Sequence, residues 1–402
     1  MRPFDGARIC LGVTGGIASY KSVWLARLLT QAGAEVDVVL SRSAREFVGA
    51  ITFEAVTGRP VHTELIAEGR ALDHLKLARE SRLVIIAPAT ADFLARAAAG
   101  QADDLMTAVL LATRAPVLVV PAMNDRMWAH AQVQANATHL RSLGYLVMSP
   151  DTGPLASPAE GAGAGRMPEP EAVVAEAARQ LEADSGLAGR HVVVSAGPTR
   201  EPLDPVRFLS NRSSGRMGVA IAVAAHRRGA RVTLVHGPLE VRLPAGVLAV
   251  AVETTDDMAA AVRASLADAD VLVMAAAPAD FKPVAPASQK IKKDNAPGSV
   301  ALVRTPDILL STRDARRPGA VVVGFALETE RLLERAKAKL EAKALDLVVA
   351  NDATEAGAGF GVSTNRVTLV GRDGAAEALP LASKDAVADA ILDRVEALLR
   401  GR

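Results

Sequence analysis

One stretch decides how the second half of this chain is interpreted: SNRSSGRMG, residues Ser210–Gly218. Upstream, His191–Ser195 is a short β-branched run that predicts a strand. Downstream, Met217–Arg228 is alanine-rich with helical periodicity, so the small polar residues fall at a helix N-terminus. Free backbone N–H groups and the positive end of the helix dipole favour an anion there. An ordinary cap is the alternative, but Asn211 and Arg216 crowd the same turn, and a solvent-exposed cap needs no such donors.

Composition limits the classes of protein that this chain can form. Its 402 residues are long for one hydrophobic core and predict two domains. The net charge of +1 argues against nucleic acid or an anionic membrane as a partner. A single cysteine excludes an internal disulfide and a cysteine-based zinc site, and indicates a cytoplasmic protein. The N-terminus has no apolar signal core, and no apolar run approaches the ~20 residues of a membrane span.

The first half of the chain has the rhythm of a doubly wound α/β fold. Strand-like runs alternate with helical segments, which predicts a parallel sheet. Ligands of such sheets bind beyond the carboxyl ends of the strands, so the loops after the strands matter most. The predicted strands are Arg8–Val13, Glu35–Leu40, Leu83–Ala87 and Val117–Val120.

Each of these four strands is followed by unusual residues. After the first, Thr14–Ser19 contains two glycines that let the backbone approach a phosphate at a helix start. It matches neither the dinucleotide-binding nor the P-loop pattern, and a tight turn is the alternative. The later strands are followed by Ser41–Ser43, Pro88–Asp92 and Pro121–Trp128.

A second α/β domain follows a linker at 183–189, and we place the boundary near residue 185. Its sheet is again predicted to be largely parallel and doubly wound. Val367–Val370 and Ala376–Leu379 predict a terminal hairpin. The other predicted strands are Val232–Val235, Val247–Val252, Val271–Met274, Val321–Phe325 and Leu345–Val349.

The run from Ala196 to Gly218, AGPTREPLDPVRFLSNRSSGRMG, resembles the signature of the phosphopantothenate–cysteine ligase half of bacterial bifunctional coenzyme A biosynthesis enzymes. Further matches to this family are Ala275–Asp280, Lys290–Lys293, Pro306–Leu309 and Gly324–Thr329. One departure is Pro278, where the family more often has valine. The resemblance implies that CTP with Mg²⁺ activates the phosphopantothenate carboxylate as an acyl-cytidylate before the amine of cysteine attacks. No metal ligand is assigned.

The resemblance also implies a role for each matched residue. Asn211 polarises the activated carboxyl group, while Asp280 and Phe325 read and pack the cytosine. Two alternatives stay open: the basic tetrad at Lys290 is also typical of a solvated patch, and Lys339 and Lys343 also fit a charged outer helix face. The implied CTP-binding residues are Ser213, Gly215, Asp280, Lys290, Pro306, Asp307, Ile308, Leu309, Phe325, Lys339 and Lys343.

In the first half, Thr14–Ala18, Ala87–Ala91 and Pro121–Trp128 resemble the FMN-binding, homo-oligomeric cysteine decarboxylases. The resemblance implies that Asn124 holds the substrate carboxylate and that His74 is the catalytic base, against the alternative of a satisfied surface histidine. FMN would oxidise the cysteinyl carbon–sulfur centre before CO₂ leaves and then return the hydride. The implied FMN-binding residues are Gly15, Gly16, Ile17, Ser41, Thr90 and Met123.

One departure from that family concerns its substrate flap. The glycine-rich run 155–167 resembles the flap, but Ser157 stands where the family has a cysteine that protonates the intermediate. The only cysteine is Cys10, inside the first strand, where an inert core residue is expected. Glu160 could donate the proton if flap closure raised its pKa. A water held by Ser157 is one alternative, and a solvated loop carboxylate at Glu160 is the other.

These observations predict an enzyme with an FMN-dependent phosphopantothenoylcysteine decarboxylase domain at residues 1–185 and a CTP-dependent ligase domain at 186–402. It would make 4′-phosphopantetheine from phosphopantothenate and cysteine. By resemblance it would be a homo-oligomer, a dodecamer. The absent flap cysteine favours an alternative, an active ligase fused to a regulatory flavoprotein. A flavin prenyltransferase shares the first fold type but leaves residues 190–402 unexplained.

Overall fold

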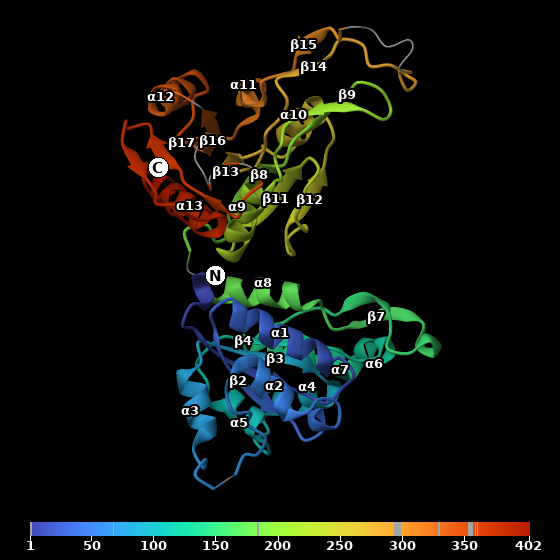
Figure 1. Cartoon of the computed structure of the whole chain (residues 1–402). Helices are drawn as coiled ribbons and strands as arrows, with labels where there is room; N and C mark the ends of the chain where they lie inside the picture. Colours follow the sequence, from blue (N-terminus) through green and yellow to red (C-terminus); the bar gives the residue numbers. More distant parts are fainter. Residues whose placement is uncertain are drawn as a thin grey trace. The chain divides into compact units, whose positions relative to one another are not determined.

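The computed structural model describes residues 2–66, 68–182, 185–292, 299–328, 330–352, 357, 359 and 361–402. The chain divides into two compact units, Met1–Glu182 and Ala183–Arg402. Figure 1 colours the first unit from blue to green and the second from green to red. Each unit has its own sheet and its own buried clusters, so the α/β architecture with two domains is confirmed.

Five parallel strands form the sheet of the first unit, in the order β2-β1-β3-β4-β5. Neighbours are parallel throughout, so every strand ends at the same edge. The connections leave β1 in one direction and β3 in the other, which opens a crevice beside the loops that follow these two strands. The strands are β1 (Arg8–Val13), β2 (Glu35–Leu40), β3 (Leu83–Ala89), β4 (Val117–Pro121) and β5 (Leu146–Val147).

Helices cover both faces of this sheet because successive strand side chains point to opposite sides. Leu11 of β1 packs in one buried cluster with α1, α2 and α8, whereas Cys10 packs in another with α4, α5 and α7. Burial, and secondly the charge of Asp37, raise the pKa of Cys10 to about 12. The helices are α1 (Ser19–Gln31), α2 (Ala50–Thr57), α3 (Asp73–Glu80), α4 (Ala91–Ala98), α5 (Leu105–Ala112), α6 (Asp125–Ala129), α7 (Ala131–Ser142) and α8 (Pro170–Leu181).

The second unit contains an eight-stranded sheet in the order β12-β11-β8-β13-β16-β17-β19-β20. Its strands are parallel up to β17, and the predicted terminal hairpin β19–β20 is confirmed as the antiparallel edge. The strands are β8 (His191–Ala196), β11 (Arg231–His236), β12 (Leu248–Ala251), β13 (Val271–Met274), β16 (Val321–Glu328), β17 (Leu347–Asp352), β19 (Thr368–Gly371) and β20 (Ala376–Ala378).

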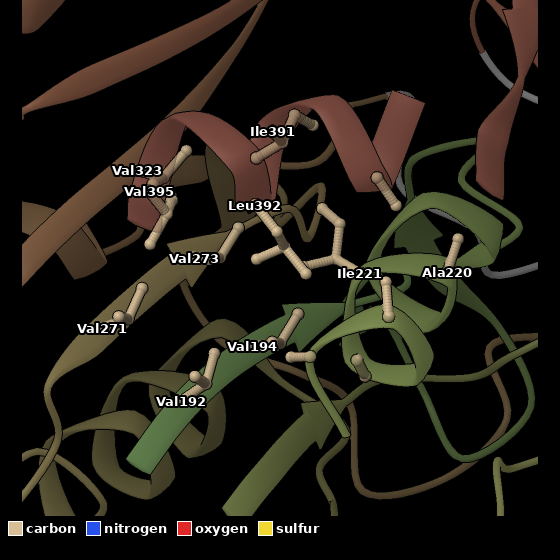
Figure 2. Close-up of a cluster of buried hydrophobic side chains, with 14 of the residues drawn as sticks. Val192, Val194, Ala220, Ile221, Val271, Val273, Val323, Ile391, Leu392 and Val395 are labelled. Atoms are coloured by element: carbon tan, nitrogen blue, oxygen red, sulfur yellow. The ribbon is translucent and has the colours of Figure 1, made fainter. Parts of the chain in front are cut away.

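Two helices pack together on one face of this larger sheet. Figure 2 shows Ile221 of α9 and Leu392 of α13 meeting Val194 of β8 and Val273 of β13 in a fully buried cluster. The opposite face is covered by α10, α11 and α12. These helices are α9 (Arg216–Arg227), α10 (Thr255–Ala264), α11 (Ile308–Ser311), α12 (Leu332–Ala342) and α13 (Lys384–Arg400).

Several antiparallel pairs of two to five residues were not predicted. In the second unit they are β9–β10, β14–β15 and β18–β21, too short to give a periodic signal. In the first unit the expected glycine-rich flap contains the hairpin β6–β7. The strands are β6 (Asp151–Pro154), β7 (Ala162–Arg166), β9 (Arg200–Pro202), β10 (Phe208–Ser210), β14 (Phe281–Pro283), β15 (Leu302–Arg304), β18 (Thr364–Asn365) and β21 (Ala382–Ser383).

Among the described residues, we find no helix with the length and apolarity needed to cross a membrane.

Candidate functional sites

The loops after four strands of the first unit meet at the carboxyl edge of its sheet. The Thr14 hydroxyl donates to the Pro88 carbonyl at 2.7 Å and accepts from the Thr90 amide at 3.0 Å. Gly15 lies against the next loop, because a Cβ there would run into the side chain of Ser43. These loops contain the predicted FMN residues Gly15, Gly16, Ile17, Ser41, Thr90 and Met123.

Helix α1 begins at this edge without a side-chain cap. Ala18 precedes the helix and makes no capping hydrogen bond. The Ser19 hydroxyl donates instead to the carbonyls of Thr14 at 3.0 Å and Gly16 at 2.7 Å. The Ser19 and Lys21 amides donate to the Gly16 and Ala18 carbonyls. The glycine-containing turn and the positive end of the α1 dipole still fit the phosphate of a flavin nucleotide.

Asn124 lies after β4 and caps helix α6. Its side-chain oxygen accepts from the Arg126 amide at 2.9 Å, which turns the NH₂ group toward the flap. That NH₂ group donates to a carboxylate oxygen of Glu160 at 2.8 Å. Two predicted catalytic residues that are 36 positions apart are therefore in direct contact. The Asn124 amide, which was predicted to hold the substrate carboxylate, therefore already holds the carboxylate of Glu160.

The flap that carries Ser157 and Glu160 is anchored by its glycines. The Met123 amide donates to the Gly165 carbonyl at 2.9 Å. A Cβ at Gly165 would strike the Met123 carbonyl, and one at Gly163 would strike Asp125. Only glycine allows this close approach of two backbones. The hairpin base is thus fixed on the Asn124 loop, and the tip brings Glu160 to it.

His74 lies elsewhere in the first unit, on α3. It is half-buried and lines a hollow of about 440 Å³ with apolar residues that include Leu65, Ala108 and Leu111. Its Nδ1 is buried and has no hydrogen-bond partner among the described residues. None of the other predicted site residues lines this hollow. The assignment of His74 as the catalytic base stays a prediction.

A cavity of about 890 Å³ lies in the second unit, at the carboxyl edge of its sheet. All the residues predicted for the ligase line it, except Lys290. They come from the start of α9, the segments after β13 and β15, the strand β16 and the helix α12. These lining residues are Asn211, Ser213, Gly215, Asp280, Pro306, Asp307, Ile308, Leu309, Phe325, Lys339 and Lys343.

The opening motif forms the wall of this cavity beside α9. Gly215 has a φ of 77°, which glycine adopts without strain, and it turns the chain into the helix. Gly218 lets the first turn press on β8, since a Cβ there would lie 2.7 Å from the Ser195 carbonyl oxygen. Asn211 donates its NH₂ group to the carbonyls of Ala277 at 3.2 Å and Pro278 at 3.0 Å. Polarising a substrate carboxyl group with that NH₂ would require one of these bonds to open.

On the α12 side of the cavity, the lysines are already engaged. Lys343 forms an ion pair with Asp307 at 2.8 Å, and Lys339 donates to the Phe325 carbonyl at 2.6 Å. Burial works to raise the pKa of Asp307, but the hydrogen bonds from Lys343 and the Leu310 amide outweigh it and hold the pKa below its usual range. These lysines therefore face the cavity and not the outer surface that was the alternative.

Lys290 is exposed on a loop outside the described lining, and Lys293 lies outside the described residues. The loop is held by Asp204, which accepts from the Ile291 amide at 3.1 Å. Arg207 hydrogen-bonds Asp204 and is the largest cause of the lowered pKa of that carboxyl. Arg207 also donates to the Ile291 carbonyl at 2.9 Å.

Five of the described polar lining residues lie outside the motifs named above: Arg304, Thr305, Asn351, Asn365 and Lys384. Asn351 is the penultimate residue of β17, so the rule that ligands bind at carboxyl ends of parallel strands could have found it. Lys384 begins α13 and follows no parallel strand, so the sequence holds no comparable signal for it.

Two family models together match most of the chain. A model described as the DNA/pantothenate metabolism flavoprotein C-terminal domain matches residues 187–399. A model described as Flavoprotein matches residues 2–182.

Curated relatives match over nearly their full length. The coenzyme A biosynthesis bifunctional protein CoaBC of Mycobacterium tuberculosis (strain ATCC 25618 / H37Rv) is 45% identical, over 98% of this chain and 97% of that protein. Its namesake in Vibrio cholerae serotype O1 is 42% identical over 98% of each chain. The chain belongs to this bifunctional coenzyme A biosynthesis family.

Solved structures resemble each half of the chain. The C-terminal domain of a CoaBC protein is 37% identical and covers 54% of this chain and all of that domain, with a TM-score of 0.47. The FMN-dependent cysteine decarboxylase SpaF is 33% identical and covers 40% of this chain and 89% of its own, with a TM-score of 0.36.

Proposed function

We propose that the second unit ligates cysteine to 4′-phosphopantothenate with CTP, and that the first unit decarboxylates the product to 4′-phosphopantetheine with FMN. The observation that carries this proposal is the cavity that gathers the predicted ligase residues from segments far apart in the sequence. The boundary near residue 185 would separate the two activities.

Ligation is supported by the chemistry of the cavity. Helix α9 begins at the cavity without a side-chain cap, and the N–H groups of a helix start stabilise the charge that accumulates in phosphoryl and acyl transfer. Asp280 and Asp307 are the two carboxylates among the described lining residues. Because Asp280 is assigned to the cytosine and Asp307 is paired with Lys343, we propose that Mg²⁺ binds mainly through the phosphates of the nucleotide.

Decarboxylation is supported by the carboxyl edge of the first sheet. The start of α1 would hold the FMN phosphate, and Asn124 would hold the substrate carboxylate as it now holds that of Glu160. When bound, FMN supplies reversible hydride transfer. We further propose a cytoplasmic homo-oligomer; exposed Ile17, Tyr20, Phe47 and Ile51 in the first unit support an interface there.

A product assay tests both halves. Purified protein with phosphopantothenate, cysteine, CTP and Mg²⁺ is expected to form 4′-phosphopantetheine, and omission of CTP should stop the reaction. Supplied phosphopantothenoylcysteine should bypass the need for CTP. The protein should also be yellow and release FMN on denaturation; colourless protein that takes up no added FMN contradicts the assignment of the first unit.

Ser157 favours one alternative, a flavoprotein unit that no longer turns over. In that case the assay would yield phosphopantothenoylcysteine or an enethiol as the final species. The same experiment therefore separates the two functions.

A further inference from the structure

One end of the cavity in the second unit holds two cations without a described carboxylate partner. Arg216 is the first residue of α9, and Lys384 is the first residue of α13. Both line the cavity, and Lys384 is only 7% exposed. The charge of Arg216 is close enough to add to the effect of burial in lowering the pKa of Lys384. Two like charges in a half-buried site are costly unless an anion joins them.

At this end of the cavity, several side-chain N–H donors have no described acceptor. Among the described residues, the Nζ of Lys384 makes one hydrogen bond, to the Gly359 carbonyl at 3.0 Å. The Nε of Arg216 is buried and has no partner among the described residues. Asn365 accepts from the Gly359 amide at 3.3 Å and the Arg366 amide at 3.1 Å through its side-chain oxygen, which leaves its NH₂ group as a donor.

The other end of the same helix pair shows how this fold normally treats buried arginines. Helices α9 and α13 pack together (Figure 1). Near the end of α9, Arg227 pairs with Asp389, and Arg228 pairs with Asp393 at 2.8 Å and Glu396 at 2.9 Å. Cations are therefore neutralised away from the cavity, whereas the pair that faces it has no described counterion.

The remaining lysines of the cavity are engaged. Lys343 is paired with Asp307, and Lys339 is bonded to the Phe325 carbonyl. Arg216 and Lys384 also lie at the N-terminal ends of two helices of 12 and 17 residues, where the helix dipoles add positive potential.

We propose that Arg216 and Lys384 form a phosphate-binding subsite in this cavity, with Asn365 as an additional donor. The identity of the ligand rests on the proposed ligase function. A phosphate could come from either substrate, the 4′-phosphate of phosphopantothenate or the triphosphate of CTP. The subsite itself requires only an anion with several acceptor oxygens.

The test uses the full chain with Lys384→Met, Arg216→Gln and Lys384→Arg, and with Lys337→Met as the control. Lys337 is exposed on α12 and does not line the cavity. Calorimetry measures the Kd of CTP in the absence of phosphopantothenate. Steady-state kinetics measure the KM of phosphopantothenate at saturating CTP. Each neutral substitution removes a charge-assisted contact, and we expect roughly a ten- to hundredfold rise in one of these constants.

The two measurements distinguish the two possible sources of the phosphate. A rise in the KM of phosphopantothenate with an unchanged Kd of CTP assigns the 4′-phosphate, and the reverse assigns the triphosphate. Lys384→Arg should recover most of the loss, which a role in packing alone would not predict. If the wild type ligates and neither constant changes in the neutral variants, the subsite is wrong.

A second measurement tests the subsite even if the protein shows no ligation. Inorganic pyrophosphate is titrated into wild type, Lys384→Met and Lys337→Met, with circular dichroism to confirm that each is folded. Weaker binding by Lys384→Met alone supports the subsite even if the wild type shows no CTP-dependent ligation, which would overturn only the proposed function. Equal binding by all three would overturn the subsite.

Discussion

The two units use the same architecture and arrange their predicted site residues differently. In the second unit, segments from Asn211 to Lys343 line one cavity. In the first unit, Asn124 and Glu160 are in contact at the sheet edge, while His74 lines a separate hollow on α3. Loops that follow parallel strands are brought together by the sheet itself. The sheet does not place a residue on a covering helix, such as His74, beside these loops.

The largest expected effect comes from Asn124→Asp in the first unit. It would place a carboxylate against Glu160 and against the substrate carboxylate. Repulsion of like charges costs several kcal/mol, so decarboxylation should fall by about a thousandfold. Ligation in the second unit should be unchanged. Release of CO₂ from phosphopantothenoylcysteine measures the first, and CTP-dependent release of pyrophosphate measures the second. Equal loss of both activities would show that the two sites do not act independently.

Two substitutions in the second unit should spare decarboxylation. Asn211→Asp brings a carboxylate toward that of the substrate, and Lys290→Gln removes a charge-assisted contact of about 1.5–3 kcal/mol, or roughly ten- to hundredfold in ligation. Because Lys290 lies outside the described lining, its effect also measures whether its side chain contacts the nucleotide. Ligation at the native rate by Lys290→Gln would place the phosphate contact elsewhere in the cavity.

The next effect concerns Glu160→Gln in the flap. The amide can still accept a hydrogen bond from Asn124, so the flap contact survives while the acid is lost. We expect CO₂ release to continue and the formation of 4′-phosphopantetheine to slow by at least about tenfold. Mass spectrometry detects the accumulated enethiol. Finished product at the native rate would exclude Glu160 as the proton donor.

The smallest effect is expected for Asp204→Asn, which weakens the support of the Lys290 loop. The pKa of Asp204 is lowered in the folded protein, so its contribution is present above the unfolded pKa and is lost only as pH falls through the lower folded value. Between about pH 5 and pH 8 the carboxylate stays ionised, and the ratio of variant to wild-type ligation should therefore be constant. The effect should be smaller than that of Lys290→Gln; a ratio that changes across this range would contradict the assignment.

Much of the fold could be predicted because β-branched runs and glycine-rich loops recur at regular intervals. The strand β8, the start of α9 near Arg216 and the terminal hairpin β19–β20 all follow from local patterns. The hairpin β6–β7 could not be predicted. Its glycines have low strand propensity and are required by contacts with Met123 and Asp125 that only the folded chain reveals.

Some residues of the candidate sites could likewise be predicted from local patterns, and others could not. Residues within a recognisable motif, such as Asn211 and Asp280, line the same cavity. Lys384 is 168 positions from Arg216, and no local pattern joins them. The contact of Glu160 with Asn124 likewise depends on how the hairpin folds back on the loop after β4.

The burial of Cys10 has a consequence for the redox chemistry of the whole chain. The proposed reactions take up one thiol compound, cysteine, and yield another, and the disulfides that such compounds form on oxidation exchange with accessible protein thiolates. This chain contains no second cysteine, and the pKa of about 12 leaves Cys10 without a reactive thiolate near neutral pH. The folded protein can therefore handle thiol substrates without becoming a mixed-disulfide partner of them. With Ser157 in the flap, an oxidant has no thiol there to attack.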